Sequence, residues 1–372
     1  MTLYPTLIKQ ALATVRYPGN GKNLIDNNML DDDLRIDGMS VSFSLIFPKP
    51  TDPFRQSVLK AAETAIHREI GKDVQVSIQA KSLTQLPPQP EKLLPGVKNI
   101  IAVSSGKGGV GKSTVTANLA IGLARMGYKV GLLDADIFGP TIPKMLAVEE
   151  QRPYAEEVDG RTLIVPIERH GVKLLSIGFF VDPDQATLWR GGMASNALKQ
   201  LIGEALWGPL DYFVIDTPPG TSDIHLTLLQ TLAITGAVIV STPQQVALAA
   251  ARKGVNMYLN DKVNVPILGI VENMAWFTPE AHPEERYFLF GQGGASALAD
   301  ALQVPLLAQI PLVQGLCEGG DKGQPAVLNP ASPSGIAFMQ LAARVVTQVD
   351  RRNQQLPPTE RVQMQHRPHR II

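Results

Sequence analysis

The pattern of hydrophobic and polar positions changes near residue 98. From there on, short runs that are apolar at almost every position alternate with longer segments whose apolar residues recur every three to four positions. The runs expected to form strands are 99–104, 129–133, 172–177, 211–215, 236–241, 266–271 and 305–309. The segments expected to form helices lie near 112–126, 194–206, 223–233, 245–260, 294–302 and 333–349. This alternation predicts an α/β fold with a doubly wound, mostly parallel sheet whose strands are buried on both faces.

The first 80 residues follow a different pattern, which predicts a small α+β domain. Helices are expected at 5–15 and 53–70, and strands at 34–36, 41–46 and 74–78. Residues 81–97 are rich in proline and lack periodicity, as in a semi-stiff linker. The larger domain is expected over 98–350, and the polar, proline-broken tail 351–372 is expected to be disordered.

Composition excludes several classes of protein. The 372 residues include 34 basic and 34 acidic side chains, so nothing favours non-specific binding to nucleic acid or to an acidic membrane. No apolar stretch approaches the roughly 18 residues that span a bilayer, and the N-terminus MTLYPTLIKQ lacks the pattern of a secretory signal. The single cysteine, Cys317, excludes an intramolecular disulfide. We therefore expect a cytoplasmic protein with no nucleic-acid partner and no stable membrane association.

Residues 106–113, here called the phosphate loop, read GKGGVGKS and match the pattern Gly, four residues, Gly, Lys, Ser or Thr. Glycines let the backbone approach a triphosphate closely, and the following helix directs its N-terminal N–H groups at the same anion. Lys112 is expected to reach the β- and γ-phosphates and Ser113 to hold Mg²⁺. The predicted nucleotide-binding residues are Gly106, Lys107, Gly108, Gly109, Val110, Gly111, Lys112, Ser113 and Thr114.

Two carboxylates follow the second expected strand of the larger domain. Period-2 alternation points Asp134 and Asp136 to one face. A carboxylate near the γ-phosphate can orient the attacking water, and Asp136 is the candidate for this role. Asp134 is expected nearer the Mg²⁺ or the loop. The alternative is that both aspartates only cap the turn from strand to helix.

A third carboxylate, Asp216, ends the apolar run at 211–215 and precedes Thr-Pro-Pro-Gly. An acid at this place typically orders the Mg²⁺ shell opposite the loop serine, so Ser113 and Asp216 are the predicted Mg²⁺ residues. The backbone N–H of Gly220 could meet the γ-phosphate, which would make this turn sensitive to the nucleotide. Asp223 is expected to be an ordinary helix N-cap.

The motifs GKGGVGKST, DADIFGPT, IDTPPGTSD and VENM resemble those of the Mrp/ApbC family of iron–sulfur cluster carrier ATPases, over roughly residues 1–350. That family belongs to the deviant phosphate-loop class, with the nitrogenase iron protein and the cell-division ATPase MinD. The resemblance implies an ATP-hydrolysing homodimer that transfers clusters to apoprotein clients or assists their delivery. It implies that Lys107 reaches the partner's nucleotide, that Asp136 and Asp216 are switch aspartates, and that Asn273 contacts the adenine. The predicted catalytic residues are thus Lys107, Lys112, Asp136 and Asp216.

The sequence departs from this family in its cysteines. Family members usually carry Cys-x-x-Cys just after the ENM motif, where thiolates from two protomers bridge one cluster. Here that segment reads AWFTPEAHPEERYFLFG, and residues 47–53 of the small domain also lack cysteine. His282 is a conceivable iron ligand, although such a loop histidine is more often solvated. Cys317 is the remaining candidate thiolate, and its alternative role is that of a small, half-buried residue.

Two other functions compete with cluster delivery. A positioning ATPase of the MinD or ParA type would need an amphipathic C-terminal helix or a basic patch, and the tail offers neither a clean apolar face nor a long basic run. A small-molecule kinase is disfavoured by Lys107 and by the additional N-terminal domain.

Overall fold

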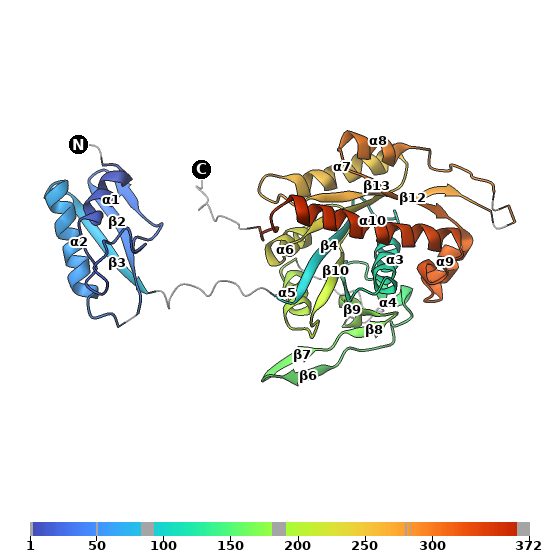
Figure 1. The fold of residues 1–372 in the computed structure, drawn as a ribbon, viewed down its shortest axis with the longest axis horizontal. Helices are drawn as coiled ribbons and strands as arrows, with labels where there is room; N and C mark the ends of the chain where they lie inside the picture. Colours follow the sequence, from blue (N-terminus) through green and yellow to red (C-terminus); the bar gives the residue numbers. More distant parts are fainter. Residues whose placement is uncertain are drawn as a thin grey trace. The chain divides into compact units, whose positions relative to one another are not determined.

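The computed structural model describes residues 3–49, 51–82, 93–180, 191–279, 281–282 and 284–362. The chain divides into two compact units, Met1–Glu91 and Lys92–Ile372 (Figure 1).

The N-terminal unit is a three-stranded sheet with two helices. Its elements are α1 (Pro5–Ala13), β1 (Arg35–Asp37), β2 (Ser40–Phe47), α2 (Arg55–Glu69) and β3 (Gln75–Ser82). The order is β1-β2-β3, with β1 antiparallel and β3 parallel to β2, and α2 lies between the two parallel strands in sequence. Alternate residues of β2, including Val41, Phe43 and Leu45, are buried against Leu12 and Ile66 of the helices. The unit therefore has a hydrophobic core of its own.

The second unit is built around an eight-stranded sheet in the order β13-β12-β11-β4-β10-β5-β9-β8. Every neighbouring pair is parallel except β8 and β9. The strands are β4 (Val97–Ser105), β5 (Val130–Asp134), β8 (Ile167–Arg169), β9 (Val172–Ser176), β10 (Leu210–Asp216), β11 (Gly236–Ser241), β12 (Ile267–Phe277) and β13 (Leu306–Leu312). The predicted α/β class with a mostly parallel sheet is confirmed.

Helices cover both faces of this sheet. One hydrophobic cluster packs α3 (Lys112–Arg125) and α10 (Pro333–Gln355) on one face. A second cluster packs α5 (Gly191–Gly203), α6 (Asp223–Thr231), α7 (Gln245–Leu259) and α8 (Gly294–Ala301) on the other. Two short helices, α4 (Ile142–Met145) and α9 (Gln314–Asp321), lie in contact with one another. Because β4, β5 and β10 are adjacent and parallel, the segments that follow them meet at one edge of the sheet.

The chain beyond residue 350 differs from the sequence-based expectation. Helix α10 continues to Gln355 because its buried face extends through Val345 and Val349. Arg352 then bonds to the Pro357 carbonyl, and the Val362 N–H donates to the Leu229 carbonyl of α6 at 3.0 Å. Residues 351–362 are therefore ordered against the second unit, contrary to the expected disorder, and residues 363–372 lie outside the described residues.

Pattern analysis also missed a hairpin between β5 and β9. Strands β6 (Ala155–Val158) and β7 (Arg161–Ile164) pair antiparallel, and their side chains are mostly exposed. Exposed strands of four residues carry no apolar periodicity by which they could be recognised. Within the described ranges, no helix is both long and apolar enough to span a lipid bilayer.

Candidate nucleotide-binding site

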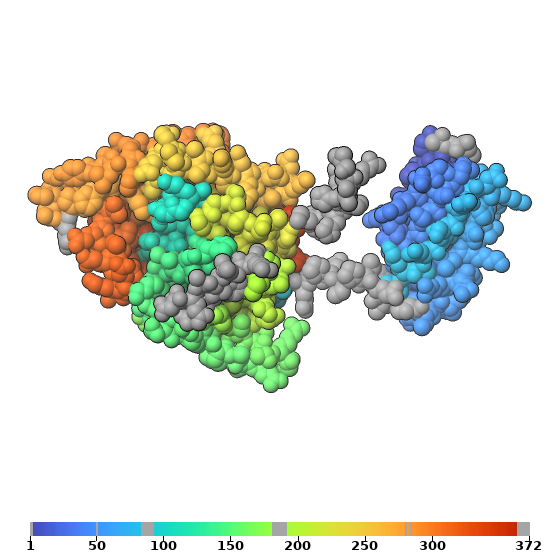
Figure 2. All heavy atoms as spheres, turned by 180° about the vertical axis from the view of Figure 1, so that it is seen from behind, coloured from blue at the N-terminus to red at the C-terminus, as the bar shows by residue number. Residues whose placement is uncertain are grey.

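The phosphate loop connects β4 to α3 in a backbone conformation that requires glycine. Gly109 and Gly111 both have φ of 79°. A Cβ added to Gly106 would lie 2.1 Å from the carbonyl carbon of Ala250 in α7, so the loop packs directly on that helix. In Figure 2, teal atoms reach the surface beside the yellow atoms of the α7 region. Gly106 and Gly220 line one pocket together with Val246 and Ala250 of α7. The glycines serve both the turn and this close approach.

Lys112 and Ser113, the first residues of α3, converge on Asp216 at the end of β10. The Lys112 Nζ lies 2.8 Å from Asp216 Oδ2, and the Ser113 hydroxyl donates to the same oxygen at 2.6 Å. The Thr116 hydroxyl donates to Asp216 Oδ1 at 2.7 Å. Asp216 is 0% exposed, so three donors stabilise a buried carboxylate. Sequence analysis missed Thr116, although its place three residues after Ser113 puts it on the same face of the helix.

Asp136 also faces Lys112, with its Oδ2 3.7 Å from the Lys112 Nζ. Burial raises the pKa of the Asp136 carboxyl, and the positive charge of Lys112 opposes that shift. The structure thus brings Lys112, Ser113, Asp136 and Asp216 together at the carboxyl edge of the sheet.

Asp134 has a different environment. Its side chain is 0% exposed. It accepts three hydrogen bonds, from the Ser176 hydroxyl at 2.9 Å, from the Asp136 N–H at 3.2 Å and from the Ile142 N–H at the start of α4. Burial, followed by the negative charge of Asp216, raises its pKa to about 8. Asp134 therefore caps the turn from the strand to α4, as the alternative interpretation expected, whereas the Asp136 carboxylate faces Lys112.

Lys107 and Asn273 lie on other sides of the loop. The Lys107 ammonium donates to Gln244 Oε1 at 3.5 Å, beside the start of α7. The Asn273 amide nitrogen donates to the Val110 carbonyl at 2.9 Å, while its Oδ1 is buried and has no hydrogen-bond partner among the described residues. A Cβ at Gly111 would lie 2.1 Å from the Asn273 nitrogen. Asn273 therefore packs against the phosphate loop and keeps one free acceptor.

The segment after Asp216, residues 217–222, is here called the switch turn. The Gly220 N–H donates to the Ser105 carbonyl at 2.8 Å with φ of +74°, which ties the turn to the start of the phosphate loop. The N-cap of α6 is Ser222, whose backbone is extended, and Asp223 is the first helical residue. The expectation that Asp223 is the N-cap was wrong by one position.

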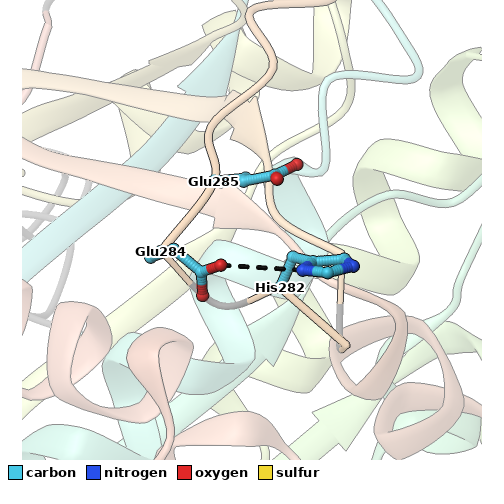
Figure 3. Close-up of side chains that lie close together, drawn as sticks. All are labelled: His282, Glu284 and Glu285. Carbon is cyan, nitrogen blue, oxygen red and sulfur yellow. Dashed lines mark ion pairs between the residues drawn. The ribbon is translucent and has the colours of Figure 1, made fainter.

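The segment that follows Asn273 forms an arm without cysteine. Phe277 and Tyr287 pair antiparallel at the base of this arm. Between them in sequence lie three side chains whose possible metal-ligand atoms are within 4.8 Å of one another: His282, Glu284 and Glu285 (Figure 3). All three are exposed, and their one ion pair joins His282 Nδ1 to Glu284 Oε1 at 3.6 Å. Solvated charges account for this arrangement.

Cys317, the only cysteine of the chain, is exposed on α9. Four thiolates usually hold an iron–sulfur cluster, so one chain alone does not supply the customary ligand set.

Comparison with known proteins agrees with this geometry. Residues 96–346 match the family model of the NUBPL iron-transfer P-loop NTPases, and residues 6–78 match that of the iron–sulfur cluster assembly proteins. An iron–sulfur cluster carrier protein of Synechocystis is 43% identical over 340 residues, covering 91% of this chain and 96% of the relative. The carrier protein of Escherichia coli K12 is 53% identical over 257 residues, which is 68% of either chain.

A solved structure supports the assignment of the larger unit. The nucleotide-binding protein of Archaeoglobus fulgidus, described as a complex with ADP with cobalt found, is 38% identical, with a TM-score of 0.57. It covers 67% of this chain, and 96% of its own length is matched. The chain therefore belongs to the family of iron–sulfur cluster carrier proteins, which are P-loop NTPases.

Proposed function

We propose that this chain is a Mg²⁺-dependent ATPase whose nucleotide cycle serves the delivery of iron–sulfur clusters. The observation that carries the proposal is the convergence of Lys112, Ser113 and Asp216 at the phosphate loop. A hydroxyl and a carboxylate are the oxygen ligands that Mg²⁺ prefers, so Ser113 and Asp216 fit the ion directly or through its waters. Bound Mg²⁺ would neutralise charge on the β- and γ-phosphates.

Nucleotide binding requires Lys112 to change partners. Its ammonium group pairs with the carboxylates of Asp216 and Asp136. A triphosphate would offer this lysine a stronger anionic partner, and the carboxylate of Asp216 would then be available to hold Mg²⁺ with Ser113. Asp136 is then free to accept a hydrogen bond from the attacking water and to orient it for attack on the γ-phosphate.

Asn273 and Lys107 complete the site in different ways. The free Oδ1 of Asn273 can accept from the exocyclic amino group of adenine, which favours ATP over GTP. The related deviant phosphate-loop proteins use a lysine at the position of Lys107 on the partner's nucleotide. We propose the same role here, in a homodimer; among the described residues, Lys107 makes one side-chain hydrogen bond, the 3.5 Å bond to Gln244, which has to break for Lys107 to extend.

The cargo poses a separate chemical question, because Cys317 is the only thiol. A homodimer supplies two Cys317 thiolates, so we propose that two further ligands come from the assembly factor or the client apoprotein while the cluster is handed over. An exposed free thiol also fits a reducing compartment, and we place the protein in the cytoplasm.

The experiment that tests the ATPase assignment compares Asp136→Asn with Asp223→Asn. Asp136→Asn should retain ATP affinity and lose about tenfold or more in turnover, because the amide cannot accept a proton from water. Asp223 is exposed at the start of α6, and its variant should hydrolyse ATP at the wild-type rate. Equal turnover of the two variants at the wild-type rate would refute the role of Asp136, and the absence of ATP hydrolysis by the wild-type protein would refute the ATPase assignment.

A further inference from the structure

We propose that His225 is a positioning residue for hydrolysis, which couples the switch turn to the occupancy of the nucleotide site. This inference rests on the ATPase function proposed above. His225 lies on the first turn of α6, is 1% exposed, and sits three residues after Ser222, the last residue of the switch turn. Neither the motifs nor the hydrophobic pattern singles it out, because an isolated histidine on a helix face carries no local signal.

The hydrogen bonds of His225 define its tautomer. The Ser222 backbone N–H donates to His225 Nδ1 at 3.2 Å, so Nδ1 carries a lone pair and the ring proton resides on Nε2. Burial, with the positive charge of Lys112 acting in the same direction, lowers the pKa of His225 to about 4. The ring is therefore neutral at physiological pH.

The second ring nitrogen has no partner among the residues that the structure describes. His225 Nε2 is buried, and no described group accepts its hydrogen. An unsatisfied buried donor is rare in native proteins and calls for an explanation, such as a catalytic role or a bound group. The switch turn begins directly after Asp216, which accepts a hydrogen bond from Ser113 of the phosphate loop, so the first turn of α6 with His225 starts at the same carboxyl edge of the sheet as the nucleotide site. The positive charge of Lys112 also acts on the ring. We infer that its acceptor, an oxygen of the phosphates or of their hydration shell, arrives with the nucleotide.

The surroundings of His225 explain how such a bond would act on the rest of the chain. Gly220 ties the switch turn to Ser105, the last residue of β4 before the phosphate loop, and His225 ties it to α6 through Ser222. From α6, the Thr227 hydroxyl contacts that of Ser195 in α5 at 2.8 Å. A bond made by Nε2 would thus fix the turn that carries Gly220 and pass the change to the surface formed by α5 and α6.

Two variants separate the roles of the ring nitrogens. His225→Asn places a carbonyl oxygen near the Nδ1 position and keeps the acceptor for Ser222, but removes the Nε2 donor. His225→Gln can place an amide N–H near Nε2. We expect the ATP affinity of His225→Asn to lie within about twofold of wild type and its kcat to fall about tenfold. The kcat of His225→Gln should fall by no more than about threefold, which is half of the tenfold loss on a logarithmic scale. His282→Asn, on the exposed arm, should match wild type and serves as the control.

Ring-nitrogen NMR gives a readout that does not depend on hydrolysis. With ¹⁵N-histidine labelling, His225 is one of six histidines and is assigned by its loss in the Asn variant. We expect an Nε2–H tautomer throughout pH 5.5–8, and a downfield shift of the Nε2 proton when Mg²⁺ and a non-hydrolysable ATP analogue are added. An unshifted Nε2 proton, wild-type kcat in His225→Asn, or a His225→Gln variant no better than Asn would overturn the proposal. A wild-type protein that hydrolyses no more ATP than Lys112→Ala would instead refute the ATPase function, and the NMR result would still decide the role of His225.

Discussion

The ammonium group of Lys112 lies 2.8 Å from a carboxylate oxygen of Asp216, and both side chains are buried. The phosphate-loop lysine is therefore held by an internal anion until nucleotide arrives. The ion pair keeps the lysine pre-positioned at the mouth of the loop, at a place where an unpaired buried charge would be strongly destabilising. Nucleotide binding is then an exchange of one anion for another.

Lys112→Ala should abolish ATP binding, because it removes the ammonium group that bonds to the β- and γ-phosphates. We expect a loss of affinity of about 100-fold or more, measured by titration with a fluorescent ATP analogue. Lys98→Ala is the matched control, because Lys98 pairs with Asp211 on the surface. ATP binding by Lys112→Ala with an affinity close to that of the control would remove the phosphate-loop assignment.

Lys107→Ala should still bind ATP but lose hydrolysis or nucleotide-linked dimerisation, since Lys107 is assigned to the partner's nucleotide. Turnover should fall about tenfold or more, and sedimentation with ATP should show a smaller dimer fraction than wild type. The exposed Lys129 provides a control lysine away from the loop. Unchanged turnover and unchanged dimerisation in Lys107→Ala would count against a site shared between protomers.

Asp134 predicts the pH dependence of stability in nucleotide-free protein. Its pKa is raised from 3.8 to about 8 in the folded chain, chiefly by burial. Such a group contributes stability that is fully present below the unfolded pKa and is lost as pH rises through the folded pKa. The free energy of unfolding should therefore fall between pH 4 and pH 8, and Asp134→Asn should flatten this fall and stabilise the protein at pH 9 by on the order of 2 kcal/mol.

Urea denaturation at a series of pH values, with EDTA present, measures this effect. In the Asp134→Asn variant, the side-chain amide oxygen can still accept from the Asp136 N–H, and the amide nitrogen can donate to the Ser176 hydroxyl; the long bond from the Ile142 N–H is lost. Asp223→Asn should leave the pH profile unchanged. A wild-type slope that persists in the Asp134→Asn variant would show that another group is responsible.

The packing of the phosphate loop on α7 predicts that alanine substitutions at two loop glycines differ in their effect on the free energy of unfolding. Gly106→Ala would place a Cβ 2.1 Å from the Ala250 backbone, whereas Gly108→Ala meets nothing within 4 Å and has no positive φ. We expect Gly106→Ala to lower the free energy of unfolding by about 2–4 kcal/mol and Gly108→Ala by less than about 1 kcal/mol. Equal stability of the two variants in urea denaturation would contradict this account of the loop.

The sequence was informative where one local pattern carries both structure and chemistry. The apolar runs and the spacing of Gly106, Lys112 and Ser113 predict the strand, loop and helix that the structure shows. Asp136 and Asp216 follow from their places at strand ends, because parallel strands bring those ends together.

Other features depend on contacts between distant segments and leave no local pattern. The bond between Thr116 and Asp216 spans 100 residues, and that between Ser176 and Asp134 spans 42. That the Nε2 of His225 is buried without a partner among the described residues can be recognised only from the structure around it. The predicted helix ended before the end of α10, because the polar residues after 350 were interpreted as disordered. Hydrogen bonds from Arg352 to the Pro357 carbonyl and from the Val362 N–H to the Leu229 carbonyl hold this segment in place.

The most direct test of the central claim is anaerobic reconstitution with iron and sulfide, followed by transfer to an apoprotein client with and without ATP. Absorption spectra and iron counts are compared for wild type, Cys317→Ala and Lys112→Ala. We predict that wild type binds iron and sulfide through Cys317, that Cys317→Ala does not, and that ATP accelerates transfer by wild type but not by Lys112→Ala. Wild-type protein that retains no cluster, and whose addition with ATP leaves client maturation unchanged, would contradict the account.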